Sequence, residues 1–297
     1  MPIFESSDPS RLIPELLPSI CRTDAFFDYA VGTSAGSLSP RTNWSSLSMY
    51  EFSLPPLSEQ RRVIRLLNAL EDTIEAYRDL VASSILLRKA IANHVFRQSK
   101  LMLPLQDFVK ESAYGPRFPG DNYHPNGNVK TLRTTDFATH GRLSFETAPA
   151  AMLDLKTARQ HRLVDGDFLL SRSGEYAGMT RVFHAAEAPD ECFIPAAFLI
   201  RFRLDSTKLL PDYLYEFCES PTGALAVRSL AKGSAQPNIS GTSFLALPIP
   251  HMPLAEQELI CERIIGVRNA ECSAEERCSN LRNLQHAILN HRLMEDM

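Results

Sequence analysis

Polar side chains suited to reading the edges of nucleic-acid bases occur in several turn-like segments of the chain. Arginine can form two hydrogen bonds with guanine, and glutamine or asparagine can form two with adenine. Arg172 lies in the run Ser-Arg-Ser-Gly-Glu-Tyr, and Gln236 and Asn238 closely follow Lys232. An isolated arginine in a loop is more often simply solvated, so each residue is a candidate and not yet a site. The candidate base-contacting residues are Tyr114, Arg117, Arg133, Thr134, Ser171, Arg172, Ser173, Tyr176, Lys232, Gln236 and Asn238.

Catalytic chemistry has little support in the sequence. The chain has no phosphate-binding Gly-x-x-x-x-Gly-Lys-Ser/Thr loop and no His-Glu-x-x-His motif. The Asn-Pro-Pro-Tyr motif of amino-methyltransferases is also absent. Ser171, Glu175 and Tyr176 leave open an uncharacterised hydrolase or transferase, but no histidine stands at a suggestive position beside them. The sequence therefore predicts a non-catalytic chain that binds neither a cofactor nor a metal.

The charge balance limits how strongly the chain can bind a nucleic acid. The formal net charge is −4, and residues 101–250 carry fifteen Lys and Arg against sixteen Asp and Glu. A domain that relied on phosphate contacts would be more basic, whereas one that reads bases needs only a few well-placed polar side chains. We therefore expect weak binding by the chain alone, with further affinity supplied by basic partners.

Composition and cysteine spacing are those of a globular protein of the cytoplasm. The 297 residues are 44% hydrophobic and 22% charged, which is enough for a core of ordinary size. No run approaches eighteen apolar residues and the start of the chain does not resemble a signal peptide, so we expect a cytoplasmic protein with no membrane association. The six cysteines include no Cys-x-x-Cys pair, which predicts neither a disulfide framework nor a zinc site.

The elements that would position these side chains are short strands mixed with helices. Runs rich in β-formers and broken by turns predict strands, and a run with helical spacing predicts one helix, so the fold class is α+β. The predicted strands lie at 142–148, 166–173, 180–186 and 196–204, and the predicted helix lies at 209–220.

The chain also repeats itself at an offset of 197 residues. Residues 11–96 align without a gap on 208–293 with 17 identities in 86 positions, including Gly36, Ser37 and Pro40 with their counterparts and a shared Pro-Leu-x-Glu-Gln. An internal repeat is stronger evidence of the architecture than any local sequence pattern, so we infer that the chain contains two versions of one unit. The first version also predicts a strand at 48–55.

Each Pro-Leu-x-Glu-Gln precedes about forty residues without proline. Apolar residues recur at steps of three and four from Val63 to Val81 and from Ile260 to Ile288, which indicates two coiled-coil seams. A single stripe of this kind can equally pack into a globular core. Two stripes at matching places favour helices that pair with each other, antiparallel, each roughly 60 Å long.

These features resemble the DNA-specificity (S) subunits of type I restriction-modification systems. The resemblance rests on "LPPLSEQRRVIRLLNALEDTIE" and "IPHMPLAEQELICERI", and on the stretches "YGPRFPGDNY", "TLRTTDF", "GDFLLSRSGEYAGMTRVF", "FIPAAFLIRFRL" and "KGSAQPNISGTSFLALPIP". Subunits of this family contain two target-recognition domains, each followed by a long spacer helix. The resemblance implies one globular target-recognition domain plus two long antiparallel coiled-coil helices, with Arg172, Tyr176, Lys232 and Gln236 foremost among the DNA contacts.

The resemblance also implies domain boundaries. Residues 1–56 correspond to the C-terminal tail of a first target-recognition domain, 57–99 to spacer helix 1, 100–252 to a complete target-recognition domain and 253–297 to spacer helix 2. The segment 97–207 has no counterpart before Arg11. The chain is then expected either to bind one half-site weakly or to pair with a second copy of itself.

The implied partners are those of a phage-defence restriction system. They are double-stranded DNA, methyltransferase (modification) subunits and a motor-nuclease (restriction) subunit. S-adenosylmethionine would belong to the methyltransferase, so the chain itself is expected to bind no cofactor. A pure assembly protein whose DNA reading has decayed is an alternative, suggested by the acidic balance and the missing first domain.

Overall fold

The computed structural model describes residues 5–34, 41–233 and 236–294. The chain divides into two compact units. The terminal unit combines residues 1–83 with 270–297, and the central unit comprises residues 84–269. Of the repeat identities named above, those at Gly36, Ser37 and Pro40 lie outside the described residues. Among the residues that are described, no helix has both the length and the apolar character needed to cross a membrane.

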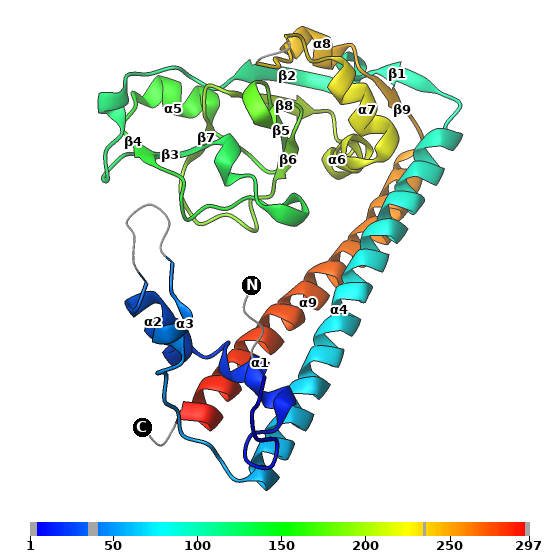
Figure 1. Ribbon diagram of the computed structural model, residues 1–297. Coiled ribbons are helices and arrows are strands. Elements are labelled where there is room, and N and C mark those ends of the chain that lie inside the picture. Colours follow the sequence, from blue (N-terminus) through cyan, green and yellow to red (C-terminus); the bar gives the residue numbers. More distant parts are fainter. Residues whose placement is uncertain (1–4, 35–40, 234–235, 295–297) are drawn as a thin grey trace. The chain divides into compact units, whose positions relative to one another are not determined.

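Two long helices run through both units (Figure 1). They are α4 (Leu57–Gln98, 42 residues) and α9 (Leu254–Met294, 41 residues). Both begin at the Leu of the Pro-Leu-x-Glu-Gln motif, because Pro at the preceding position suits a helix start and no later proline interrupts the helix. The prediction of two long helices is confirmed.

The two helices pair along the predicted seams. In the terminal unit, Leu67 near the start of α4 and Leu289 near the end of α9 are buried in one cluster, and further along Glu71 accepts a hydrogen bond from Gln285 at 3.0 Å. In the central unit, Phe96 near the end of α4 shares a cluster with Ile264 near the start of α9. Early positions of one helix meet late positions of the other, so the pairing is antiparallel as predicted.

The repeat at an offset of 197 residues is present in the structure. Helix α2 (Asp24–Gly32) of the terminal unit has the same length as α7 (Pro221–Ser229) of the central unit and starts 197 positions earlier. Thr23 and Ser220 cap these helices in the same way, each accepting a hydrogen bond from the backbone N–H three residues later. The shorter counterparts, at the same offset, are η1 (Pro14–Leu16) with α1 (Leu17–Ile20) against α6 (Pro211–Glu219), and α3 (Trp44–Leu47) against α8 (Gly241–Leu245).

The described residues of the central unit form three small sheets (Figure 1). A four-stranded antiparallel sheet has the order β2-β8-β5-β6, a three-stranded sheet has the order β4-β3-β7, and β1 pairs with β9. The strand bounds are β1 (Met102–Pro104), β2 (Val109–Tyr114), β3 (Val129–Leu132), β4 (Ala150–Ala151), β5 (Asp167–Ser171), β6 (Thr180–Phe183), β7 (Phe193–Pro195), β8 (Leu199–Leu204) and β9 (Pro248–Pro250). The remaining elements are α5 (Leu155–His161), η2 (Leu105–Phe108), η3 (Gly120–Asn122), η4 (Thr134–Asp136), η5 (Thr139–Gly141) and η6 (Gly174–Tyr176).

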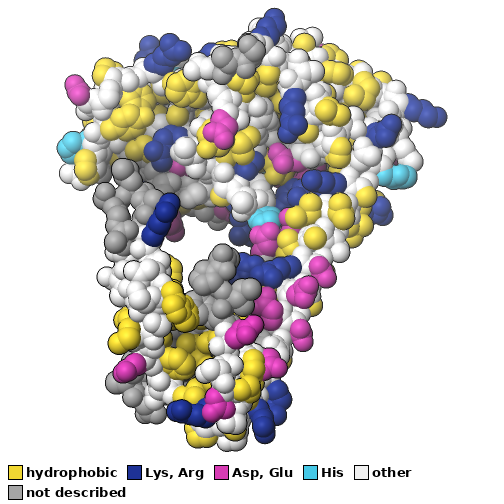
Figure 2. Space-filling view, in the orientation of Figure 1, with side chains coloured by type: hydrophobic (Ala, Val, Ile, Leu, Met, Phe, Trp, Pro, Cys, Tyr) yellow, Lys and Arg dark blue, Asp and Glu magenta, His cyan; other side chains and the backbone are white. Residues whose placement is uncertain are grey.

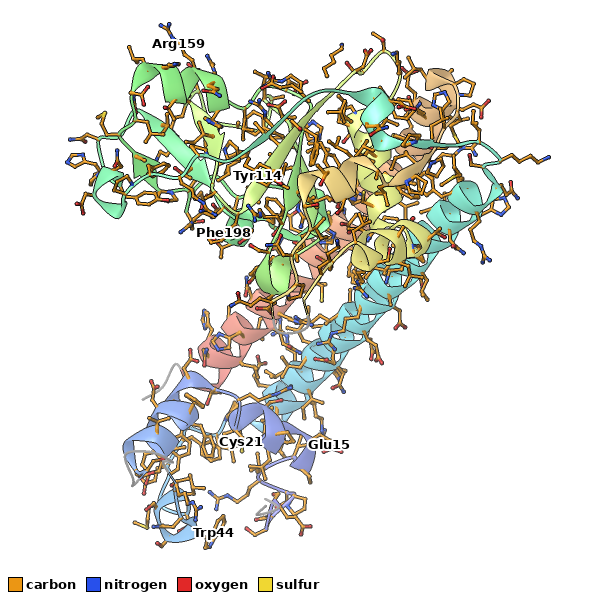
Figure 3. All side chains as sticks on the ribbon, turned by 90° about the horizontal axis from the view of Figure 1, so that it is seen from above. Glu15, Cys21, Trp44, Tyr114, Arg159 and Phe198 are labelled. Atoms are coloured by element: carbon orange, nitrogen blue, oxygen red, sulfur yellow. The ribbon has the colours of Figure 1, made fainter. Side chains whose placement is uncertain are left out.

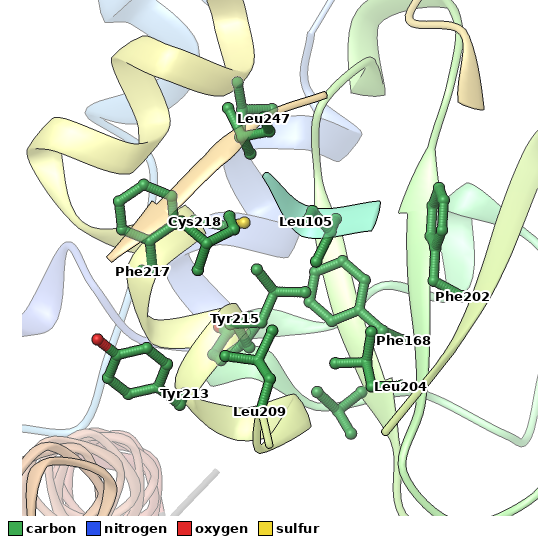
Figure 4. Packing of buried hydrophobic residues seen from close by; sticks show 14 of the residues in the cluster. Leu105, Phe168, Phe202, Leu204, Leu209, Tyr213, Tyr215, Phe217, Cys218 and Leu247 are labelled. Carbon is green, nitrogen blue, oxygen red and sulfur yellow. The ribbon is translucent and has the colours of Figure 1, made fainter. Parts of the chain in front are cut away.

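The main core of the central unit lies between the four-stranded sheet and helices α6 to α8 (Figure 4). Phe168 of β5 and Phe202 of β8 are fully buried and contact the ring of Phe244 on α8, with centroids 6.0 and 5.2 Å away. Both faces of β5 and β8 are buried over most of their length, and the buried residues include Arg201 of β8 as well as apolar side chains. This packing holds the four-stranded sheet rigidly.

Two predicted strands are wrong. Residues 142–148 form no strand. Leu143 makes a single bridge to Phe137, and its side chain is buried in a cluster with residues of β3, β5, β6, β7 and β8. Residues 48–55 are also not a strand, although their repeat counterpart includes β9. β9 forms because β1 pairs with it, and the described part of the terminal unit offers residues 48–55 no such partner.

In the described part of residues 11–56, apolar side chains pack against the helix ends of the terminal unit. Leu16 and Ile20 are fully buried and share a cluster with Val63 of α4. Phe26 contacts the ring of Tyr50 edge-on at 5.1 Å. Figure 3 shows this segment with Glu15, Cys21 and Trp44 labelled.

Candidate nucleic-acid interface

The strands β2 and β5 end, and β8 begins, at the same end of the four-stranded sheet. Tyr114, the last residue of β2, pairs with Ile200 near the start of β8, and Ser171, the last residue of β5, pairs with Leu199. Because neighbouring antiparallel strands run in opposite directions, the segments that follow β2 and β5 lie beside the segment that precedes β8. We call this surface the loop edge, and it consists of residues 114–117, 133–134, 172–176, 196–198, 232–233 and 236–238.

Residues 236–239 are held against the segment that follows β5. The backbones of Lys232 and Asn238 exchange two hydrogen bonds of 3.0 and 2.9 Å. The N–H of Gly174 donates to the backbone carbonyl of Pro237, and the N–H of Ile239 donates to the backbone carbonyl of Arg172. These contacts bring candidate residues near 172 and 236 together, although they are far apart in sequence.

Arg172 is stacked on Tyr114. Its guanidinium carbon lies 5.0 Å from the centre of the tyrosine ring, a cation–π geometry that orients the charged group. The hydroxyl of Tyr114 accepts a hydrogen bond of 2.9 Å from the backbone N–H of Gly241, which fixes the ring in turn. Within the described part of the chain, the buried Nε of Arg172 has no hydrogen-bond partner. A half-buried, oriented guanidinium with spare donors is well suited to a bidentate acceptor.

Arg133 is engaged within the protein. Its guanidinium donates to both carboxylate oxygens of buried Asp136, at 3.3 and 3.0 Å, and to the carbonyl of Thr147 at 2.7 Å. The hydrogen bonds that Arg133 donates to Asp136 raise the pKa of Arg133, which keeps the group charged. The N–H of Ala196 donates a hydrogen bond to the carbonyl of Leu132. This bond holds the half-buried Arg133 and Thr134 beside residues 196–198.

The remaining candidate residues differ in exposure. Ser173 is half-buried, whereas the others at the loop edge are exposed: Arg117, Tyr176, Lys232, Gln236 and Asn238. Ser171 is fully buried because it still belongs to β5. Its hydroxyl does not reach the surface, so Ser171 is not among the residues that we assign to the loop edge.

The loop edge is more basic than the rest of the central unit. On the face shown in Figure 2, Lys and Arg side chains are interspersed with acidic and hydrophobic ones. The loop edge contains three positively charged side chains and one carboxylate besides Arg133, which is neutralised by Asp136. They are Arg117, Arg172, Lys232 and Glu175. Three positive charges minus one give a local charge of +2 in a region, 101–250, whose balance is −1 (fifteen minus sixteen). Positive charge is therefore concentrated where the polar side chains meet.

The loop edge also carries an apolar side chain that the sequence did not single out. Phe198 is 61% exposed and Tyr114 is 45% exposed (Figure 3), and the N–H of Gly115, next to Tyr114, donates a hydrogen bond of 3.0 Å to the carbonyl of Leu199, next to Phe198. The sequence predicts Phe198 within a strand at 196–204, whereas β8 begins only at Leu199. The N–H of Leu199 donates to Ala196, which makes a turn immediately before the strand and presents Phe198 at its end.

Comparison with known proteins gives the fold. No family model matches the chain, and no curated protein matches it in sequence. Solved structures do match. The "HsdS subunit from Thermoanaerobacter tengcongensis" has a TM-score of 0.54 at 18% identity, over 96% of this chain and 70% of that one.

The chain has the fold of a type I S subunit. The "Type-I restriction-modification system S subunit from M. genitalium" has a TM-score of 0.62 at 11% identity, over 98% of this chain and 75% of that one. A structure described as the basis of "complex assembly" and "conformational transition of the type I R-M system" has a TM-score of 0.65 at 20% identity, over 98% and 73%. The S-subunit resemblance and the fold class predicted from the sequence are confirmed at the level of fold.

Proposed function

We propose that this chain is the sequence-specific DNA-recognition subunit of a type I restriction-modification complex, and that the loop edge reads one half-site. The observation that carries the proposal is the convergence of Arg172, Gln236 and Asn238 at one edge of a rigid sheet in a chain with the S-subunit fold. Side chains with these donors and acceptors distinguish base pairs in the major groove. The local positive charge supports contact with the phosphates on either side.

The proposed domains follow from the same fold. Residues 100–252 form the target-recognition domain, and residues 1–56 are the tail of another such domain. The assignment of the tail is supported by the equivalence of α2 with α7 and of α3 with α8. Residues 57–99 and 253–297 are the two spacer helices.

The paired helices are the proposed scaffold for methyltransferase subunits. Several large apolar side chains lie outside the seam and face solvent, and on α4 the most exposed are Leu86 and Leu87, at 69% and 52%. On α9, Leu259 and Leu284 are 46% and 48% exposed. Apolar residues repeated along a helix surface are typical of a protein contact. In the proposed function, methylation is catalysed by these methyltransferase subunits and cleavage by the motor-nuclease subunit, and this chain supplies recognition and spacing.

The test is reconstitution of the chain with its methyltransferase subunits, followed by selection of bound duplexes from a random DNA pool. The proposal predicts that the complex enriches one defined half-site and that the chain alone binds DNA only weakly, because its overall charge is negative. A complex that assembles and enriches no sequence would instead identify the chain as an assembly protein without DNA reading.

A further inference from the structure

The backbone around Phe198 is held in place by its neighbours. The N–H of Arg172 donates to the carbonyl of Phe198 at 2.9 Å, and the N–H of Ala196 donates to Leu132 at 2.7 Å. Gly115 lies directly against Ala196, so closely that a Cβ at position 115 would stand 2.0 Å from the Ala196 carbonyl oxygen. The exposed ring of Phe198 therefore projects from a turn that is fixed on both sides.

Exposure by itself does not indicate a function. Leu155 on α5 is 67% exposed, and single apolar side chains are common on protein surfaces. Phe198 differs in its position. Its own backbone is bonded to Arg172, the proposed base reader, and the turn that carries it is bonded to the segment that precedes Thr134. A duplex bound by Arg172 would cover the ring of Phe198.

The groups available to an apolar ring at that place are limited. In the major groove, base edges present hydrogen-bonding atoms and one apolar group, the 5-methyl of thymine. Phenylalanine has no donor or acceptor, so against the edges of stacked bases its ring is favourable beside an apolar group. The aromatic ring then contributes by excluding water from that methyl group.

We propose that Phe198 is a specificity-determining residue that contacts the 5-methyl group of one thymine in the half-site. This inference rests on the proposed function and names a base feature that the loop edge reads. Arg172 and Gln236 would identify bases by hydrogen bonds, and Phe198 would distinguish thymine from cytosine by the methyl group.

The experiment replaces each thymine of the selected half-site by uracil, one at a time, because uracil lacks the methyl group and keeps every hydrogen-bonding atom. Binding is measured with the complete chain in complex with methyltransferase subunits. One replacement should weaken binding by the wild type roughly fourfold, the effect of burying one methyl-sized group. The Phe198→Ala variant should bind the thymine duplex more weakly and lose the difference between thymine and uracil at that position.

Controls separate this inference from the proposed function. Leu155→Ala removes an equally exposed apolar side chain on α5 and should keep the full thymine preference. Phe198→Leu, which keeps an apolar side chain, should retain part of it. Equal uracil sensitivity in Phe198→Ala and wild type, a wild type indifferent to every uracil, or a half-site without thymine would overturn the inference. A complex that selects a sequence and still shows any of these results would leave the proposed function standing.

Discussion

Gln257 makes at the start of α9 the same three hydrogen bonds that Gln60 makes at the start of α4. The side-chain oxygen of Gln60 accepts from the N–H of Ile13 at 2.9 Å, and its amide donates to the carbonyls of Arg11 and Pro55 at 2.8 Å each.

The three partners of Gln257 stand 197 positions later. They are the N–H of Leu210 at 2.9 Å and the carbonyls of Lys208 and Met252 at 3.0 and 2.8 Å. The Gln of Pro-Leu-x-Glu-Gln is therefore structural, because it attaches the start of each long helix to the backbone segments that precede α6 or its counterpart.

Replacing either glutamine by alanine should destabilise the protein. Both side chains are fully buried, and their removal leaves one N–H and two carbonyls without that partner. We expect Gln60→Ala and Gln257→Ala each to lower the free energy of unfolding by about 1–3 kcal/mol or more, measured by urea denaturation. Gln160→Ala, at an exposed position on α5, is the matched control and should change stability little.

The helix pairing predicts a contrast between adjacent residues. Leu67 is 6% exposed in the seam, whereas Leu66 is 44% exposed. Leu67→Asp buries an unpaired charge and should cost about 3–5 kcal/mol, whereas Leu66→Asp should cost far less. Ile264→Asp should behave like Leu67→Asp, with Leu259→Asp as its exposed control. Thermal unfolding checks this, and unchanged stability in both seam variants would remove the pairing.

Arg133 should act on stability and not on base discrimination. Arg133→Ala leaves the buried carboxylate of Asp136 without its guanidinium partner, and we expect a loss of about 1–3 kcal/mol. The ratio of affinities for cognate and mismatched half-sites should stay the same, because the guanidinium is already committed within the protein. If Arg133→Ala lowered the ratio of affinities and left stability unchanged, Arg133 would instead contact a base.

The ion pair between His184 and Asp212 predicts a pH dependence. The two side chains are 3.2 Å apart, and the hydrogen bond to Asp212 raises the pKa of His184 above its ordinary value of 6.5. The contribution to stability is complete below pH 6.5 and is lost as the pH rises through the raised pKa. The melting temperature of the wild type should thus exceed that of His184→Gln in acid and approach it in base. A difference that grows with pH would contradict this sign.

The sequence predicted the parts of the fold that depend on local pattern. The long helices follow from an apolar stripe without proline, and β5, β6, β8 and α6 follow from short apolar runs with clear turns. The strand expected at 142–148 failed because strand formation needs a partner, and Leu143 finds only a single bridge. Pairing between distant segments is not visible in a local run.

The candidate site was predictable as residue types and not as a surface. Arg172 and Gln236 lie in neighbouring segments only because of two backbone hydrogen bonds. The N–H of Gly174 donates to the carbonyl of Pro237, and the N–H of Ile239 donates to the carbonyl of Arg172. Ser171 is buried because it is the last residue of β5, which lies within the strand predicted at 166–173. Phe198 was overlooked because an aromatic residue before an apolar run is indistinguishable from the strand itself.

The central claim is that the loop edge reads base identity, and Arg172 tests it most directly. The measurement is the ratio of affinities for the selected half-site and for single-mismatch duplexes, made with the methyltransferase complex of Arg172→Ala. A bidentate base contact contributes about 1–3 kcal/mol of discrimination. The ratio should therefore fall by roughly 5- to 150-fold at one position.

Gln236→Ala should lower the same ratio at a different position. Arg159→Ala removes an exposed arginine on α5 (Figure 3) and should leave every ratio intact. An Arg172→Ala complex that binds all duplexes equally less well, with its discrimination unchanged, would show that Arg172 contacts phosphate. Full discrimination in both Arg172→Ala and Gln236→Ala would contradict base reading by the loop edge.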